Sequence, residues 1–374
     1  MNSNSLSIQR MAYFTIMVFL VVYFLIVGQS ILVPLAFGAL FAFMLKPIVD
    51  FFERFIKWRI FSILMALISA IIPVSIVIYF FSSQFVDVVQ DMPSIKEKLN
   101  TGVATLYDWA KSIFGFTKAE ADEAFSNQVS SLMDAPLSFL GVGLTSTTSF
   151  LTGLFLSFIY IFLFLLYRSG FKDFLLIQAS KVNRPKLKDL IDKVQKLIQK
   201  YLYGLLLVIL ILGVLNSIGL WVIGIKHPLF WGFLAAMLAV IPYIGTFIGG
   251  ALPFLYALAT AGEMWQPVAV VVLFITVQTL EGNFITPNVI GSSVKINPLA
   301  AIVSLLVGAK IWGIAGMVLS LPVISIIKEI LKSSEAWRPV GFLLSDEIGE
   351  KEQVFKVKWD KERFRLRHFF RKRN

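Results

Sequence analysis

The side chains best suited to chemistry gather in one polar stretch of an apolar region, QTLEGNFITPNVIGSSVKINP over residues 278–298. Glu281 follows directly on the mainly apolar run 268–280, so it lies either at a helix end or inside an apolar environment. Gln278, Asn283 and Asn288 supply neutral donors and acceptors nearby. A carboxylate among amides can bind a cation or a polar solute. A solvated carboxylate at an aqueous boundary is the simpler alternative.

Lys310, in LLVGAKIWG, is a second charged residue within an apolar stretch. Three roles fit its position: an ion pair with Glu281, contact with an anionic solute, or extension of its ammonium group to the nearest water. We therefore take Gln278, Glu281, Asn283, Asn288 and Lys310 as the candidate substrate-binding or ion-binding residues.

The sequence lacks the usual signatures of enzymes and metal sites. Cysteine is absent and histidine occurs only at His227 and His368, so neither a thiolate nor a histidine-rich metal site is expected. None of the patterns GxxxxGK[ST], HExxH and GxSxG occurs. We expect no enzymatic activity, no cofactor and no bound metal.

The composition places these residues in a membrane protein. Of the 374 residues, 57% are hydrophobic and 15% are charged, whereas soluble domains have roughly 45–50% and 25%. The net charge is +11, which we attribute to a basic cytoplasmic surface rather than to nucleic-acid binding. The first apolar stretch continues into a second one without a small-residue cleavage site, so it reads as a transmembrane helix and not as a signal peptide.

We expect an all-α polytopic fold with about eight transmembrane helices, each needing roughly 20 apolar residues. The candidate spans are 11–27, 31–45, 60–81, 146–167, 203–225, 229–261, 266–280 and 298–330. Pro and Gly interrupt 229–261 and 298–330, so either could instead be broken or re-entrant, entering and leaving on one side. Lys and Arg crowd the loops near 46–59 and 168–200 and the tail, whereas 82–145 is acidic. Both termini are therefore expected in the cytoplasm.

We divide the chain into five segments: 1–81, a three-helix membrane segment; 82–145, an external amphipathic helical segment; 146–202, a fourth span with a cytoplasmic amphipathic helix; 203–331, a motif-rich transport region; and 332–374, a basic cytoplasmic tail. The amphipathic helix repeats apolar residues at helical spacing over 187–202, with lysines on its other face. It could lie on anionic lipid, pair with another subunit, or pack on its own bundle.

Helix breaks within apolar stretches free backbone groups that hydrocarbon cannot satisfy, so a break is buried in protein or lines a wet cavity. Kinking and close packing are the simpler explanation of isolated Pro and Gly. Because the breaks here come in two groups around a polar cluster, we take them as gates or hinges. The candidate gate or hinge residues are Pro242, Tyr243, Gly245, Pro253, Gly282, Pro287, Gly291, Pro298, Gly308 and Gly313.

Three stretches, IPYIGTFIGGALP, LEGNFITPNVIGSSVKINPL and LLVGAKIWGIAGMVLSLPVISIIKEI, resemble the C-terminal half of the autoinducer-2 exporter family. The similarity extends over nearly the whole chain and includes Gly316 and Pro322 among the motif residues. It implies a permease of the bacterial inner membrane that assembles as a homo-oligomer, for instance a pentamer. The chain departs from the family in having KINP at 295–298 in place of GLHP, and Lys310 in place of a small residue.

These observations favour a secondary transporter or facilitator that exports a small polar solute resembling autoinducer-2. The resemblance leaves a sodium(lithium)/proton antiporter as an alternative. A non-transporting membrane scaffold, recruiting lipid or partners through 186–200 and the basic tail, is an alternative of another class.

Overall fold

In the computed structural model, which describes residues 3–114, 147–242, 244–260, 263–291 and 295–346, almost every residue is helical. The helices are α1 (Ser3–Val27), α2 (Gln29–Glu53), α3 (Arg59–Phe114), α5 (Thr147–Leu166), α6 (Arg168–Gln178), α7 (Arg184–Ile223), α8 (Pro228–Leu238), α9 (Ile244–Thr260), α10 (Trp265–Leu280), the π-helix η1 (Glu281–Ile285), α11 (Thr286–Val289), α13 (Pro298–Ser333) and α14 (Arg338–Leu343). The predicted all-α polytopic class is confirmed.

The chain forms two compact units. The first contains α1, α2, the start of α3, α5, α6, the start of α7, α13 and α14, and its buried residues include Val49, Ile63 and Leu165. The second contains the rest of α3 and α7 together with α8, α9, α10, η1 and α11, around a core that includes Leu220, Trp231 and Val270. The polar stretch around Glu281 belongs to the second unit, and Lys310 belongs to the first.

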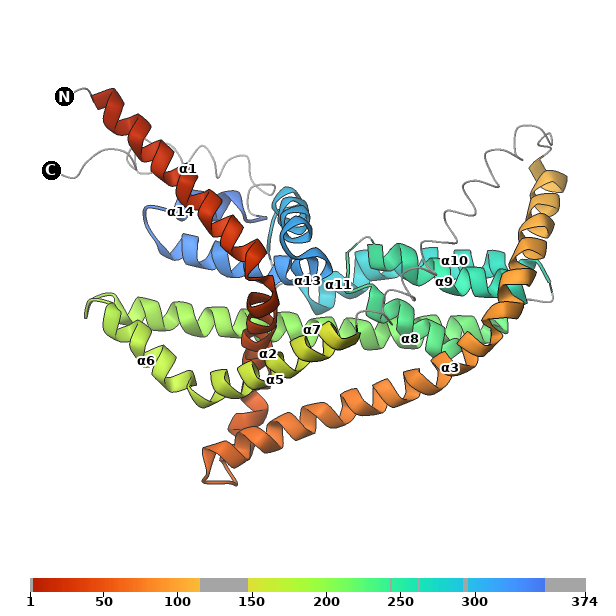
Figure 1. The fold of residues 1–374 in the computed structure, drawn as a ribbon, viewed down its shortest axis with the longest axis horizontal. Coiled ribbons are helices and arrows are strands. Elements are labelled where there is room, and N and C mark those ends of the chain that lie inside the picture. Colours follow the sequence, from red (N-terminus) through yellow and green to blue (C-terminus); the bar gives the residue numbers. More distant parts are fainter. Residues whose placement is uncertain (1–2, 115–146, 243, 261–262, 292–294, 347–374) are drawn as a thin grey trace. The chain divides into compact units, whose positions relative to one another are not determined.

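The described residues of 229–261 form a helical hairpin and not one long span. A Cβ built on Gly245 of α9 would lie 1.6 Å from the Leu238 carbonyl oxygen at the end of α8, and one on Gly249 would lie 3.0 Å from Ala235 Cα. The two contacts show that α9 runs back along α8 (Figure 1). With 11 residues, α8 is about 16 Å long, too short for a hydrocarbon core of about 30 Å. The geometry favours the re-entrant alternative.

A second hairpin lies within α13. Its backbone leaves the helical region at Trp312 and at Gly313, where φ is 59°. A Cβ on Gly316 would lie 1.9 Å from the Gly308 carbonyl oxygen, whereas residues eight apart in a straight helix are about 12 Å apart. The two arms therefore fold back on each other. The indole N–H of Trp312 donates to the Leu25 carbonyl of α1 at 2.8 Å and anchors the bend.

Five of the described helices are long and apolar enough to cross a membrane, or six if α5 and α6 form one bent span. That count includes α13 by length and composition alone. The amphipathic stretch 187–202 and the predicted fifth span form one 40-residue helix, α7. The Gln199 amide of this stretch donates to the Phe43 carbonyl of α2 at 2.9 Å, so one face packs on its own chain. The division into five segments stays a prediction, and 115–146 lies outside the described residues.

Candidate functional site

Helix α10, the π-turn η1 and helix α11 form one candidate span, Trp265–Val289. Pro287 explains the change of helix type, because it has no N–H to donate and its ring would collide with the carbonyl one turn earlier in an α-helix. The chain widens instead, and the N–H of Thr286 bonds to the Glu281 carbonyl five residues back. Single π-turns inside α-helices occur frequently at functional sites. Glu281 begins this turn.

The Glu281 carboxylate accepts hydrogen bonds from its own segment. The Gln278 amide donates to Oε2 at 2.7 Å, and the Thr286 hydroxyl donates to Oε1. Among the described residues of its own unit, no Lys or Arg forms an ion pair with it. The carboxylate is half-buried, so each oxygen retains a lone pair for a solute, a cation or water.

The packing of α7 against α10 and α11 gives the depth of Glu281. A Cβ on Gly204 would lie 3.0 Å from Ile290 Cγ1, and one on Gly219 would lie 2.3 Å from Leu273 Cδ1. The two segments therefore run antiparallel, and this register brings Glu281 level with Leu212. Leu212 lies near the middle of the apolar stretch 203–225. Glu281 thus lies within the candidate span, roughly 24 Å along the helix from Trp265 and roughly 12 Å from Val289.

A second group of polar atoms lies at a similar level. Asn216 Oδ1, Ser217 Oγ and Trp231 Nε1 are buried and have no hydrogen-bond partner among the described residues. Ser217 packs against α8, since a Cβ on Gly232 would lie 2.3 Å from its Oγ. Asn216 is level with Val277, about one turn from Glu281 by the α7–α10 register. Buried polar atoms normally have partners, so these three call for ordered water or a bound molecule.

The other predicted binding residues behave differently. Asn283 and Asn288 are exposed, and their amides donate to the carbonyls of Thr279 at 2.9 Å and Phe284 at 2.7 Å. Lys310 is exposed on the first arm of α13, and its pairing with Glu281 stays a prediction. The structure thus brings together Gln278 and Glu281 and adds Thr286.

The predicted gate residues fall into three places. Pro242, Gly245 and Pro253 belong to the α8–α9 hairpin, where Gly245 permits the close approach and Pro253 is fully buried. Gly282, Pro287 and Gly291 lie in or beside the exposed π-turn segment. Pro298 is the first residue of α13, and Gly308 lies where the two arms of α13 contact each other. Gly313 forms the bend between the arms. Tyr243 lies outside the described residues.

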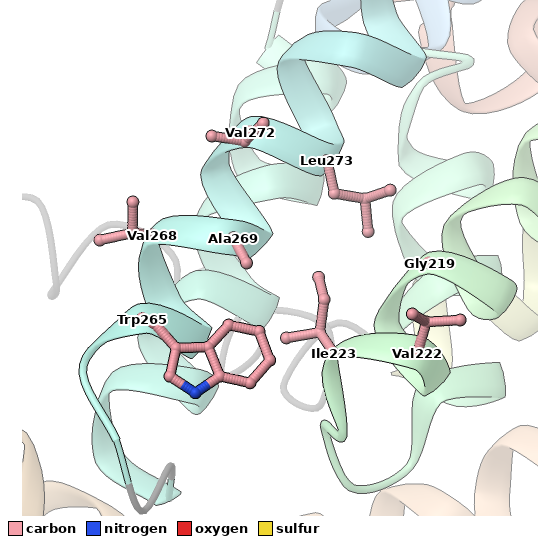
Figure 2. Close-up of a pocket in the computed structure, with 8 residues that line it drawn as sticks. All are labelled: Gly219, Val222, Ile223, Trp265, Val268, Ala269, Val272 and Leu273. Atoms are coloured by element: carbon pink, nitrogen blue, oxygen red, sulfur yellow. The ribbon is translucent and has the colours of Figure 1, made fainter.

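An apolar groove of about 620 Å³ lies elsewhere in the second unit. Figure 2 shows its lining from the end of α7 and the first half of α10, with Trp265 at one end and Leu273 at the other. Its lining residues are Gly219, Val222, Ile223, Trp265, Val268, Ala269, Val272 and Leu273. All of them are apolar apart from the indole N–H of Trp265, so the lining suits an apolar occupant better than a polar solute.

Comparison with known proteins shows the family of the chain. A family profile described as "AI-2E family transporter" matches residues 13–336. The chain belongs to the AI-2E transporter family. The match includes the π-turn segment, both hairpins and α7, and together with the several apolar helices it supports a multi-pass membrane protein.

Curated relatives of this AI-2E family member are described in general terms. A Bacillus subtilis protein described as "Putative transport protein YrrI" is 40% identical over 131 residues, and an Escherichia coli K12 protein described as "Putative transport protein YhhT" is 29% identical over 132. These alignments cover 35% of this chain and 36% and 38% of the relatives, little more than a third of their length. A Methanothermobacter thermautotrophicus protein described as "Putative transport protein" is 21% identical over 282 residues, which cover 75% of this chain and 81% of the relative.

Sequence reasoning missed several polar residues of this chain. Thr286 stood in the quoted polar stretch, and its spacing of five from Glu281 becomes a contact only through the π-turn. Asn216 and Ser217 carry no local signal beyond being polar within an apolar run. Lys328, and not Lys310, is the buried lysine, and its ammonium donates to the Lys295 carbonyl at 3.3 Å.

Proposed function

We propose that this chain is a secondary transporter or facilitator that exports a small polar solute, autoinducer-2-like, across the bacterial inner membrane through a mid-depth site at Glu281. In this proposal both termini are cytoplasmic and the chain works as a homo-oligomer. Gln278 and Thr286 hold the carboxylate, and the α8–α9 and α13 hairpins act as gates.

The observation that carries the proposal is the position of Glu281 on a π-turn, level with the middle of the apolar part of α7. A charged side chain at the centre of a bilayer costs about 2.5–3.5 kcal/mol on insertion scales, so such residues pair with one another or face water. With no basic partner described in its own unit, Glu281 needs water or a solute. Buried atoms of Asn216, Ser217 and Trp231, which have no hydrogen-bond partner among the described residues, add the same requirement.

The test compares Glu281→Gln with Glu263→Gln, the same change at an exposed carboxylate just before α10. Extracellular autoinducer-2 is measured in a deletion strain that expresses each variant, with membrane-inserted protein quantified in parallel. We expect export to be lost in Glu281→Gln and kept in Glu263→Gln at equal insertion. Normal export by Glu281→Gln would remove the carboxylate from the mechanism.

The same proteins distinguish the antiporter alternative. An antiporter in proteoliposomes should dissipate a preset pH gradient when sodium or lithium is added, whereas a solute exporter should not respond to either cation. If sodium or lithium dissipates the pH gradient and Glu281→Gln abolishes this response, the site remains at Glu281 but its substrate is a cation.

A further inference from the structure

Helix α6 carries an apolar face that is largely exposed in the described structure, with only the Phe171 ring in contact with Phe164 of α5. It follows α5, which lies within the predicted span 146–167, after one residue and is bent from it by 61°. Figure 1 shows the bend. The structure describes all of α6, and none of its residues is buried. Phe171, Phe174, Leu175 and Ile177 are 51%, 60%, 46% and 68% exposed. Phe171, Phe174 and Leu175 share one face by their spacing of three and four residues.

The bend is fixed by side chains of the first unit. The Arg59 guanidinium donates to the Leu165 carbonyl at 2.8 Å and to the Ser169 hydroxyl at 2.9 Å, on either side of the bend. Arg168 forms ion pairs with Asp50 at 2.8 Å and Glu53 at 2.5 Å at the end of α2. Lys172 of α6 pairs with Asp192 of α7 at 2.9 Å. These bonds hold α6 at an angle to the span that precedes it.

The residues after α6 are basic. From Phe174 to Lys188 the chain contains Lys181, Arg184, Lys186 and Lys188 and no acidic residue. All four side chains are exposed. A helix with an exposed apolar face beside exposed basic residues fits the boundary between acyl chains and headgroups, where anionic lipids attract the cations.

We propose that α6 lies in the surface of the bilayer, with Phe171, Phe174 and Leu175 among the acyl chains and the basic stretch 181–188 on anionic phospholipid headgroups. Continuity with α5 argues for lipid as the occupant, because a helix that follows a span after one residue starts at the membrane boundary. This surface does not depend on the transport role of Glu281.

The experiment uses the full chain, which lacks cysteine, reconstituted in vesicles of phosphatidylcholine or of equal parts of phosphatidylcholine and phosphatidylglycerol. Phe174→Cys and, as a control on the other face, Asp173→Cys each receive a nitroxide label. We expect the label at 174 to collide with oxygen and be shielded from a water-soluble nickel chelate, whereas the label at 173 is accessible to the chelate. Shielding of the label at 174 from the nickel chelate should increase in the vesicles that contain phosphatidylglycerol.

A Lys181→Gln/Lys186→Gln/Lys188→Gln variant should keep the shielding in phosphatidylcholine and lose most of the increase that phosphatidylglycerol causes. Equal chelate access at 173 and 174 in both vesicles would overturn the proposal. Spin–spin coupling between labels at 174 of two copies, independent of lipid composition, would assign the face to a second copy and also overturn it.

Discussion

The two oxygens of the Glu281 carboxylate have different donors, and the Thr286 hydroxyl is the one that depends on the π-turn. Thr286→Val keeps the shape of the side chain and removes this donor. Leaving a charged group short of one hydrogen bond costs about 1–3 kcal/mol. We expect the transport rate at low substrate to fall about tenfold, since 1.4 kcal/mol is a factor of ten.

The matched control for Thr286→Val is Thr279→Val, whose hydroxyl donates to the Ile275 carbonyl of its own helix at 2.7 Å. Export assays at equal membrane insertion should show near-normal transport for Thr279→Val. Equal transport by both variants would mean that the hydrogen bond from Thr286 does not contribute to transport.

Asn216 separates a structural role from a functional one. Replacing it by Leu removes a buried oxygen that has no partner among the described residues, and such a change can be neutral or stabilising. We expect Asn216→Leu to keep or raise the thermal midpoint in detergent while export falls. If Asn216→Leu is stable and its export is unchanged, Asn216 does not line the path of the solute.

At the scale of elements, the α8–α9 hairpin depends on the absence of a side chain at Gly245. A Cβ there would lie 1.6 Å from the Leu238 carbonyl oxygen, whereas one on Gly250 of the same helix would lie 3.5 Å from Phe274, an ordinary contact. Gly245→Ala should therefore lower the thermal midpoint by several degrees or abolish expression, and Gly250→Ala should not. Similar midpoints for the two variants would contradict the hairpin geometry.

The sequence predicted the helix breaks and left open whether each broken stretch crosses the membrane or is re-entrant. Pro and Gly within 229–261 and 298–330 indicated interruption, and both stretches fold back. Pro287 has a local effect that a sequence can show, since it lacks an N–H. The burial of Asn216 depends on α8 packing across α7, and the ion pairs of Arg168 depend on residues over a hundred positions earlier. Such long-range contacts leave no local pattern.

At the scale of the whole molecule, composition alone predicted a polytopic helical membrane protein, because the apolar fraction exceeds what a soluble core can bury. The number of membrane crossings depends on whether the two hairpins span the membrane or are re-entrant. If α13 is re-entrant, residues on either side of it face the same compartment. Lys295→Cys and Glu335→Cys, both at exposed positions, should then react with an impermeant thiol reagent added to the same side of the membrane. Labelling from opposite sides would make α13 a full span.

The central claim is that the polar segment around Glu281 faces water within the membrane. The most direct measurement is the reaction of a water-soluble thiol reagent with Asn283→Cys, at an exposed position of the π-turn, in intact cells. Ile275→Cys is the control, because Ile275 lies two turns earlier with 61% of its side chain exposed and is expected to face lipid. We predict rapid modification at position 283 and little at 275. Two equally unreactive cysteines would contradict a water-filled path at Glu281.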